Sequence, residues 1–148
     1  MKEVARNKRA YYDYNILEQI EAGISLTGFE VKAVKSGKIS LGGSYAKIFD
    51  GELFLVGADI APYQPNNTPK DYEQDRNRKL LVTKKELDTL IGKMREAGLT
   101  LVPLRAYIKG RLVKVELGLA KSKKKQDKRE AIKKRDVDRD IRRTLKPN

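Results

Sequence analysis

The sequence predicts a mainly β domain in which short antiparallel strands close into a small barrel, followed by a basic C-terminal tail. Asp50-Gly51 lies between two runs rich in β-forming residues, and this pair favours the type I′ turn of a hairpin. Residues 113–119 alternate apolar and polar side chains, which indicates a strand with one buried face. Because a closed barrel removes exposed strand edges, this pattern fits an OB-like barrel, and it fits an SH3-like barrel equally well.

The first third of the chain combines one long β-rich run with one helix signal. Residues 8–20 are rich in aromatic and β-branched types, so they predict a strand that ends at a turn over Ala22-Gly23. Thr27 and Glu30 have the spacing of a capping box, which predicts a short helix that ends near residue 36. Strands over residues 44–49 and 52–56 form the hairpin.

The remainder of the domain predicts a long loop, a helix and a second strand pair. Residues 63–78 are polar and contain two prolines, and a loop of this length is usually functional or disordered. Thr83 and Glu86 form a second capping box, and Gly98 lies where a helix C-terminus needs left-handed backbone, so residues 84–97 are expected to be helical. Strands are expected over residues 100–108 and 112–119, joined at Lys109-Gly110.

Composition narrows the possible functions. The formal net charge is +13, and residues 119–148 contribute 13 basic and five acidic side chains to it. Such an excess indicates a polyanionic partner, with nucleic acid ranked ahead of an anionic membrane. The chain has no Cys and no His, which removes disulfides, thiolate metal sites and the usual general base. We therefore expect a cytoplasmic, non-catalytic protein without cofactor, metal or membrane span.

Basic residues stand beside aromatic ones in two places, as in proteins that bind phosphates and stack on unpaired bases. Lys8 and Arg9 precede three tyrosines at 11, 12 and 14, and Arg78 and Lys79 follow Tyr72. Each tyrosine alone is better explained as a strand residue with one buried face. Glu21 alone is likewise explained more simply, as a surface carboxylate at a strand end. Its other role would be to accept a hydrogen bond from RNA.

A series of short motifs, in order along nearly the whole chain, resembles the SsrA-binding protein family (small protein B). The matching segments include Asn7-Lys8-Arg9-Ala10, Tyr12-Asp13-Tyr14, Glu21-Ala22-Gly23-Ile24, Gly28-x-Glu30-Val31-Lys32, Ser44-Tyr45, Ile60-Ala61-Pro62-Tyr63, Arg78-Lys79-Leu80-Leu81 and Asp127-Lys128-Arg129. The resemblance implies an OB-like RNA-binding barrel over residues 1–120 with accessory helices. It also implies a tail over residues 121–148 that is disordered when free and helical when bound to the ribosome.

The resemblance implies an RNA-binding adaptor of trans-translation. Such a protein binds the tRNA-like domain of transfer-messenger RNA (SsrA) and delivers it to stalled ribosomes, which tags incomplete proteins and rescues the ribosome. Its tail probes the vacant decoding site and message channel. Elongation factor Tu with GTP and alanyl-tRNA synthetase act indirectly, through the RNA, and the protein is expected to be a monomer.

The resemblance also assigns site residues. Six RNA-binding positions fall on Asn7, Tyr14, Glu21, Lys79, Leu81 and Lys114. Five more candidates lie within the matching motifs, namely Lys8, Arg9, Lys32, Tyr45 and Arg78. The ribosome-binding tail positions are Lys123, Lys124, Lys125, Gln126, Asp127, Lys128 and Arg129. Gln126 stands where the family has an aromatic residue or His, so this position can hydrogen-bond but stacks less well on a base.

Two other classes of protein share some of these features. A structural ribosomal RNA-binding protein would have a similar basic tail. An RNA-processing enzyme would also be basic, but it would need a catalytic constellation. Sequencing the RNA that co-purifies with the chain distinguishes the adaptor from a ribosomal protein. An unchanged RNA length after long incubation with Mg²⁺ argues against an RNA-processing enzyme.

Overall fold

The computed structural model describes residues 1–123 of the 148-residue chain. Tail candidates 124–129 therefore lie outside the described residues. The strands are β1 (Lys2–Arg6), β2 (Tyr14–Ile24), β3 (Ile39–Ser40), β4 (Tyr45–Phe49), β5 (Glu52–Val56), β6 (Asp59–Ile60), β7 (Arg78–Leu81), β8 (Thr100–Lys109) and β9 (Leu112–Ser122). The helices are α1 (Lys8–Asp13), α2 (Gly28–Lys35) and α3 (Lys84–Ala97), with a short 3-10 turn, η1 (Pro65–Asn67).

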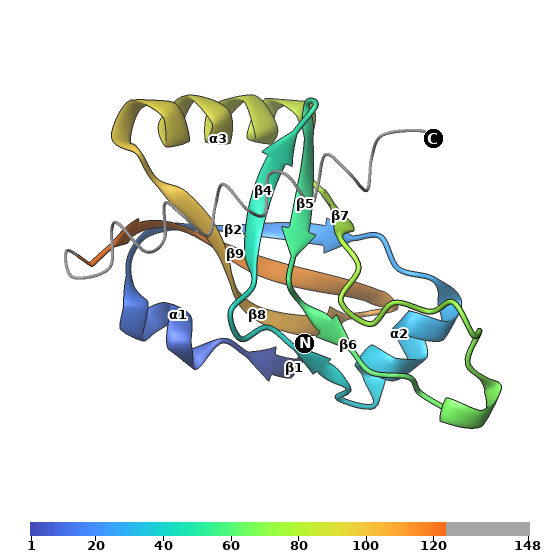
Figure 1. Ribbon diagram of the computed structural model, residues 1–148. Coiled ribbons are helices and arrows are strands. Elements are labelled where there is room, and N and C mark those ends of the chain that lie inside the picture. The colour runs from blue at the N-terminus through green and yellow to red at the C-terminus, as the bar shows by residue number, and fades with distance from the viewer. Residues whose placement is uncertain (124–148) are drawn as a thin grey trace.

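The described strands build a closed antiparallel barrel. Seven of them follow the order β1-β8-β4-β5-β7-β2-β9 (Figure 1). Strand β8 also pairs with β9, which closes six strands into a ring and leaves β1 attached to β8. One edge of β8 binds β9, and the other edge is shared by β4 and β1. Strands β3 and β6 form a separate pair. The predicted mainly β, OB-like barrel with accessory helices is therefore confirmed.

The interior of the barrel is apolar and closely filled. Alternate residues of β9 point inward, and Val115 and Leu117 have no exposed surface. Leu55 from β5 and Leu101 from β8 meet them in the same cluster. Full burial of such a side chain contributes about 1.5–3 kcal/mol. The period-2 pattern of residues 113–119 predicted this arrangement correctly.

Local signals for the hairpin and the two longer helices are also confirmed. Asp50 and Gly51 both have positive φ, 51° and 73°, as a type I′ turn requires. In α2 and α3 the N-cap threonine and the glutamate three residues later bind each other's backbone N–H groups, so both capping boxes are complete. Helix α3 ends at Gly98 in the left-handed conformation.

The predicted strand over residues 8–20 is wrong in its first part. Residues 8–13 form α1 because the side chain of Asn7 accepts a hydrogen bond from the N–H of Ala10, and Ala10 is buried. Strand β2 begins only at Tyr14 and continues through Ala22-Gly23, where a turn was expected. Gly23 serves close packing instead, since a Cβ there would lie 3.3 Å from the Cβ of Leu81 on β7.

Further strands differ from the prediction. Strands β1, β3, β6 and β7 were not predicted, because all four are short and depend on partners distant in sequence. Strand β9 continues to Ser122, two residues past the expected domain boundary, and pairs there with Tyr14 of β2. The N–H of Lys123 then donates to the carbonyl of Asp13 at 3.2 Å. The tail therefore begins beside α1.

Candidate RNA-binding surface

Strands β7, β2 and β9 bring four of the predicted site residues onto one outer surface. Gly23 of β2 pairs with Leu81 of β7 on one side and with Lys114 of β9 on the other. Glu21 and Lys79 lie two residues from Gly23 and Leu81, so the alternation of strands places them on the same side. We call the surface formed by Glu21, Lys79, Leu81 and Lys114 the outer face.

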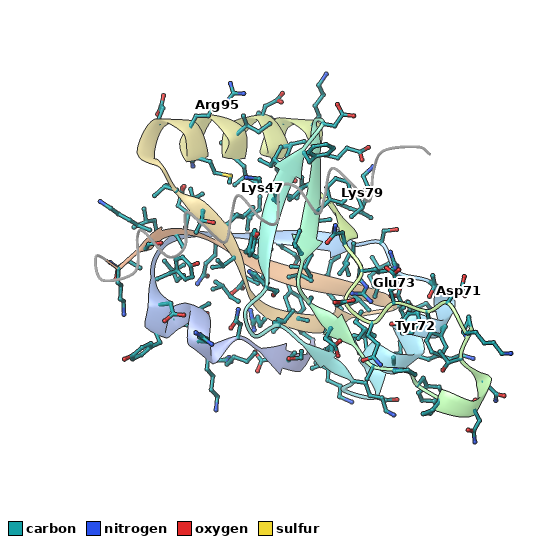
Figure 2. All side chains as sticks on the ribbon, viewed as in Figure 1. Lys47, Asp71, Tyr72, Glu73, Lys79 and Arg95 are labelled. Carbon is teal, nitrogen blue, oxygen red and sulfur yellow. The ribbon has the colours of Figure 1, made fainter. Side chains whose placement is uncertain are left out.

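The outer face combines an apolar plate with two cations. Leu81 is 50% exposed and packs over Gly23, which has no side chain to cover it. Lys79 Nζ lies 3.1 Å from a carboxylate oxygen of Glu52, and both side chains are about half exposed. Figure 2 shows Lys79 beside β5 and β7. A half-exposed ion pair of this kind contributes little to stability, so Lys79 can exchange Glu52 for a phosphate at low cost.

Glu21 is the acidic member of the outer face, and its position is fixed by two neighbours. The hydroxyl of Tyr107 on β8 donates to Oε2 of Glu21, and Lys109 Nζ lies 3.6 Å from Oε1. The Tyr107 hydrogen bond, helped by the charges of Lys109 and Lys114, holds the pKa of Glu21 below its ordinary value. Burial and the adjacent Glu21 carboxylate raise the pKa of Tyr107 to about 12. Glu21 is therefore an ionised acceptor among cations.

Helix α1 presents a second group of candidates, beside the start of the tail. Tyr12 is 76% exposed, and Lys123 Nζ lies 5.7 Å from the centre of its ring. Lys8 and Arg9 are exposed on the same helix, and Arg9 forms an ion pair of 3.1 Å with Asp13. Tyr14 is half-buried at the start of β2. An exposed aromatic ring of α1 and the first basic residue of the tail segment, Lys123, are thus neighbours.

Two of the predicted RNA-binding side chains, Asn7 and Arg78, are buried and stabilise the fold. Asn7 is only 4% exposed; it caps α1, and its amide donates to the carbonyl of Pro103 at 2.9 Å. Arg78 has no exposed surface, so its guanidinium is not available to a phosphate. The prediction that Arg78 contacts RNA directly is therefore wrong, because Arg78 and Leu80 are the buried residues of β7 and point into the barrel. Asn7 can act on RNA only by shaping α1.

Arg78 belongs to a buried cluster that organises the loop before β7. Its Nε and Nη2 donate to one oxygen of Glu30 at 2.9 and 2.7 Å, and Arg76 binds the same carboxylate. Tyr72 donates to the carbonyl of Ile60 at 2.7 Å. Figure 2 shows Tyr72 beside α2. The long polar loop is therefore held to the barrel by charge.

The pKa of Glu30 reflects this cluster. Burial alone would raise the pKa of the carboxyl group, but hydrogen bonds from Arg76, the Thr27 backbone and Arg78 outweigh burial and lower the pKa to about 2. The capping-box spacing identified Glu30 as a helix residue, but no local signal indicated that the same carboxylate also neutralises two arginines. Only the folded structure shows that Arg76 and Arg78 lie beside Glu30.

Lys32 and Tyr45 lie apart from the outer face. Lys32 is exposed on α2, and Figure 1 shows α2 and α1 at opposite ends of the barrel. Tyr45 of β4 is half-buried against the small cluster formed by Ala10, Val102, Leu104 and Ala120.

Within residues 1–123, no helix has the length and apolar character needed to cross a membrane, and no group of three or more potential ligand residues could hold a metal ion.

Fold and surface together define a class: small OB-like barrels whose strands carry cations, an exposed apolar plate and a fixed acceptor, the chemistry that a folded polyanion binds. Within this class the chain belongs to the SmpB protein family, whose model matches residues 4–147. The "SsrA-binding protein" of Chloroflexus aggregans is 50% identical over 143 residues, covering 97% of this chain and 90% of the relative. That of Carboxydothermus hydrogenoformans is 51% identical over 145 residues, covering 98% and 97%.

A solved structure shares the fold as well. A chain in the structure called "tmRNA-SmpB: a journey to the center of the bacterial ribosome" is 49% identical and superposes with a TM-score of 0.66. The match covers 80% of this chain and 83% of the solved one. Sequence and fold therefore place the chain in one family.

Proposed function

We propose that this chain is an RNA-binding adaptor of trans-translation, which binds the tRNA-like domain of transfer-messenger RNA and brings it to stalled ribosomes. Membership of the SmpB family supports this, as do relatives named for binding SsrA and the related structure from a ribosome complex. The observation on this chain that carries the proposal is the convergence of Glu21, Lys79, Leu81 and Lys114 on one outer face.

The outer face offers three kinds of contact to a folded RNA. Lys79 and Lys114 attract phosphates and position the RNA backbone. Leu81 over Gly23 gives a flat apolar area on which a sugar or an unstacked base can rest. Glu21 accepts a hydrogen bond from a donor group of the RNA, and the neighbouring lysines offset its repulsion of phosphate. Recognition then depends on shape and on one acceptor, in addition to net charge.

The tail is the second part of the proposal. Residues 123–129 carry four lysines and one arginine with Gln126 and Asp127. They follow the last described strand, whose end lies beside α1. We infer that this segment enters the vacant decoding site and message channel, where basic side chains meet ribosomal phosphates. Elongation factor Tu and alanyl-tRNA synthetase act on the RNA and contact the protein only through it. Bond making and breaking is thereby left to the ribosome and synthetase.

The RNA bound in cells tests the proposal directly. Crosslinking, purification of the intact chain and sequencing of the RNA should enrich transfer-messenger RNA above ribosomal RNA. A matched strain with Lys79→Glu and Lys114→Glu should lose this enrichment, because both phosphate contacts are reversed in sign. Stoichiometric association with one ribosomal subunit in the absence of transfer-messenger RNA would instead support a structural ribosomal protein and contradict the proposal.

A further inference from the structure

Tyr107 is almost fully covered although it lies on the charged outer side of the barrel. It is 2% exposed, and the guanidinium of Arg105 lies 5.0 Å from the centre of its ring. Its strand, β8, is separated from the strand of Glu21 by β9, so the hydroxyl reaches across β9 to the carboxylate. A phenol that spans a whole strand to reach one carboxylate has a fixed direction, because its ring is packed.

The strand register places a like charge beside Glu21, so its contact with Tyr107 matters for its orientation. Glu21 lies directly opposite Glu116 of β9, and like charges in opposed positions repel. Arg105 relieves part of this repulsion, since its Nη2 binds Glu116 at 3.1 Å. Glu21 is then left with Tyr107 and Lys109, and Lys109 is 63% exposed and lies at a longer distance. Tyr107 is thus the packed, directional partner.

We propose that Tyr107 is a positioning residue for RNA binding: its hydroxyl holds Oε2 of Glu21 so that Oε1 is presented to a hydrogen-bond donor of the RNA. This inference rests on the proposed function and deepens it. An ionised carboxylate has only acceptor sites, so the RNA group it binds is a 2′-hydroxyl or a base amino or imino group, never a phosphate. Lys109, 3.6 Å from Oε1, moves toward a neighbouring phosphate as the donor arrives.

Pre-ordering explains why such a network is useful at an RNA surface. A free glutamate side chain loses rotamer freedom when it is fixed, and this loss weakens binding. Here Glu21 keeps 39% of its side-chain surface exposed while one oxygen is already held. The RNA therefore meets an acceptor that is accessible and already oriented. Arg105 supports the arrangement from behind, through the ring of Tyr107.

A double-mutant cycle on the full-length chain tests the inference. Affinity for the isolated tRNA-like domain of transfer-messenger RNA is measured for wild type, Tyr107→Phe, Glu21→Ala and the double variant. Tyr107→Phe keeps the packed ring and should weaken binding about tenfold, the size expected for a lost hydrogen bond to a charged group. In the Glu21→Ala background, where no acceptor remains for the hydroxyl, the same change should cost less than about twofold. Tyr63→Phe, at a tyrosine exposed in the long loop, is the matched control and should bind like wild type.

The outcomes separate this inference from the proposed function. If wild type binds and Tyr107→Phe binds equally well, Tyr107 is not a positioning residue. An equal loss in both backgrounds would assign Tyr107 to packing alone and would also overturn the inference. A wild-type chain that ignores this RNA would overturn the proposed function itself.

An arm with modified RNA identifies the donor and does not depend on the folding of Tyr107→Phe. RNA with 2′-deoxynucleotides tests the sugar hydroxyl, and RNA with inosine for guanosine tests a base amino group. The replacement that weakens wild type should leave Glu21→Ala unaffected, because alanine has no acceptor and the contact is already lost. If every replacement weakens both proteins equally, Glu21 presents no oriented acceptor and the inference fails.

Discussion

Arg78 and Glu30 form an ion pair in which neither side chain has any exposed surface, with Nη2 of the arginine 2.7 Å from Oε2 of the glutamate. The pair joins β7 to α2 over 48 residues of sequence. Arg78 also donates to the carbonyls of Ala58 and Gln74, so its donors are used within the protein. A buried charge with this many partners fixes the loop between β6 and β7 against the barrel.

Glu30→Gln is expected to destabilise the fold by about 3–5 kcal/mol, because it leaves the guanidinium of Arg78 buried without a counter-charge. Urea unfolding at neutral pH measures the change. Glu18→Gln is the matched control, since Glu18 pairs with Lys93 at 2.7 Å and both side chains are about half exposed. That change should stay below about 1 kcal/mol. Equal effects of the two substitutions would show that the Glu30 cluster contributes nothing specific.

Stability should fall in acid over a defined range. The pKa of Glu30 is about 2 in the folded chain and 4.5 when the carboxyl group has none of its folded-state partners, as in the unfolded chain. Between these two values the unfolded chain binds a proton at Glu30 and the folded chain does not. The contribution of Glu30 is therefore complete above about pH 4.5 and is lost as pH falls toward 2, up to about 3 kcal/mol. Urea unfolding between pH 7 and pH 3 should show a steeper loss for wild type than for Glu30→Gln. Parallel curves would contradict this assignment.

Signals confined to a few residues could be predicted from sequence. Asp50-Gly51 specifies its turn through backbone conformation alone, and Thr27 with Glu30 specifies a helix start through two reciprocal hydrogen bonds. Prediction from sequence failed where an element depends on partners far along the chain. The β-rich composition of residues 8–20 concealed α1, because Asn7 is fixed by the carbonyl of Pro103, which no local pattern reveals.

The same distinction applies to the site. The resemblance placed Glu21, Leu81 and Lys114 in one site, and their adjacency follows from the register of β7, β2 and β9. Tyr107 was missed, because its link to Glu21 crosses a strand and spans 86 residues. Arg78 was assigned to RNA because a basic residue after an aromatic one resembles a surface motif. The resemblance had assigned both Lys79 and Leu81 to the RNA site, and strand alternation from these two residues was the signal that could have placed Arg78 on the opposite, inner side.

Glu21→Ala should weaken RNA binding although it removes a negative charge. Simple electrostatics forecasts the opposite, so the sign of the effect separates a specific acceptor from a surface carboxylate. Glu52→Ala is the matched control, because Glu52 is also a half-exposed strand carboxylate beside a lysine. We expect about tenfold weaker binding for Glu21→Ala and unchanged or tighter binding for Glu52→Ala, measured by filter binding. Tighter binding by both variants would remove Glu21 from the site.

Lys79→Gln should reduce the salt dependence of RNA binding as well as the affinity. A lysine that neutralises one phosphate adds up to about 0.9 to the slope of log affinity against log salt. Lys93→Gln is the control, since Lys93 of α3 forms a similar half-exposed ion pair, with Glu18, and is not one of the four residues of the outer face. Titrations at several salt concentrations should lower the slope magnitude only for Lys79→Gln. An identical slope in both variants and wild type would place Lys79 outside the phosphate contacts.

Removal of residues 124–148 should separate the two parts of the function. The cut leaves β9 complete, because that strand pairs with β2 up to Ser122 and the N–H of Lys123 binds the carbonyl of Asp13. Cutting at residue 121 would remove these contacts and confuse a folding defect with a loss of function. The shortened chain should keep affinity for the tRNA-like domain within about threefold at physiological salt, because the four residues of the outer face remain. Tagging of incomplete proteins on stalled ribosomes should be abolished in a reconstituted translation assay. Loss of RNA binding and tagging in the same proportion would contradict this division, since it would place the main RNA contacts in the tail instead of on the barrel.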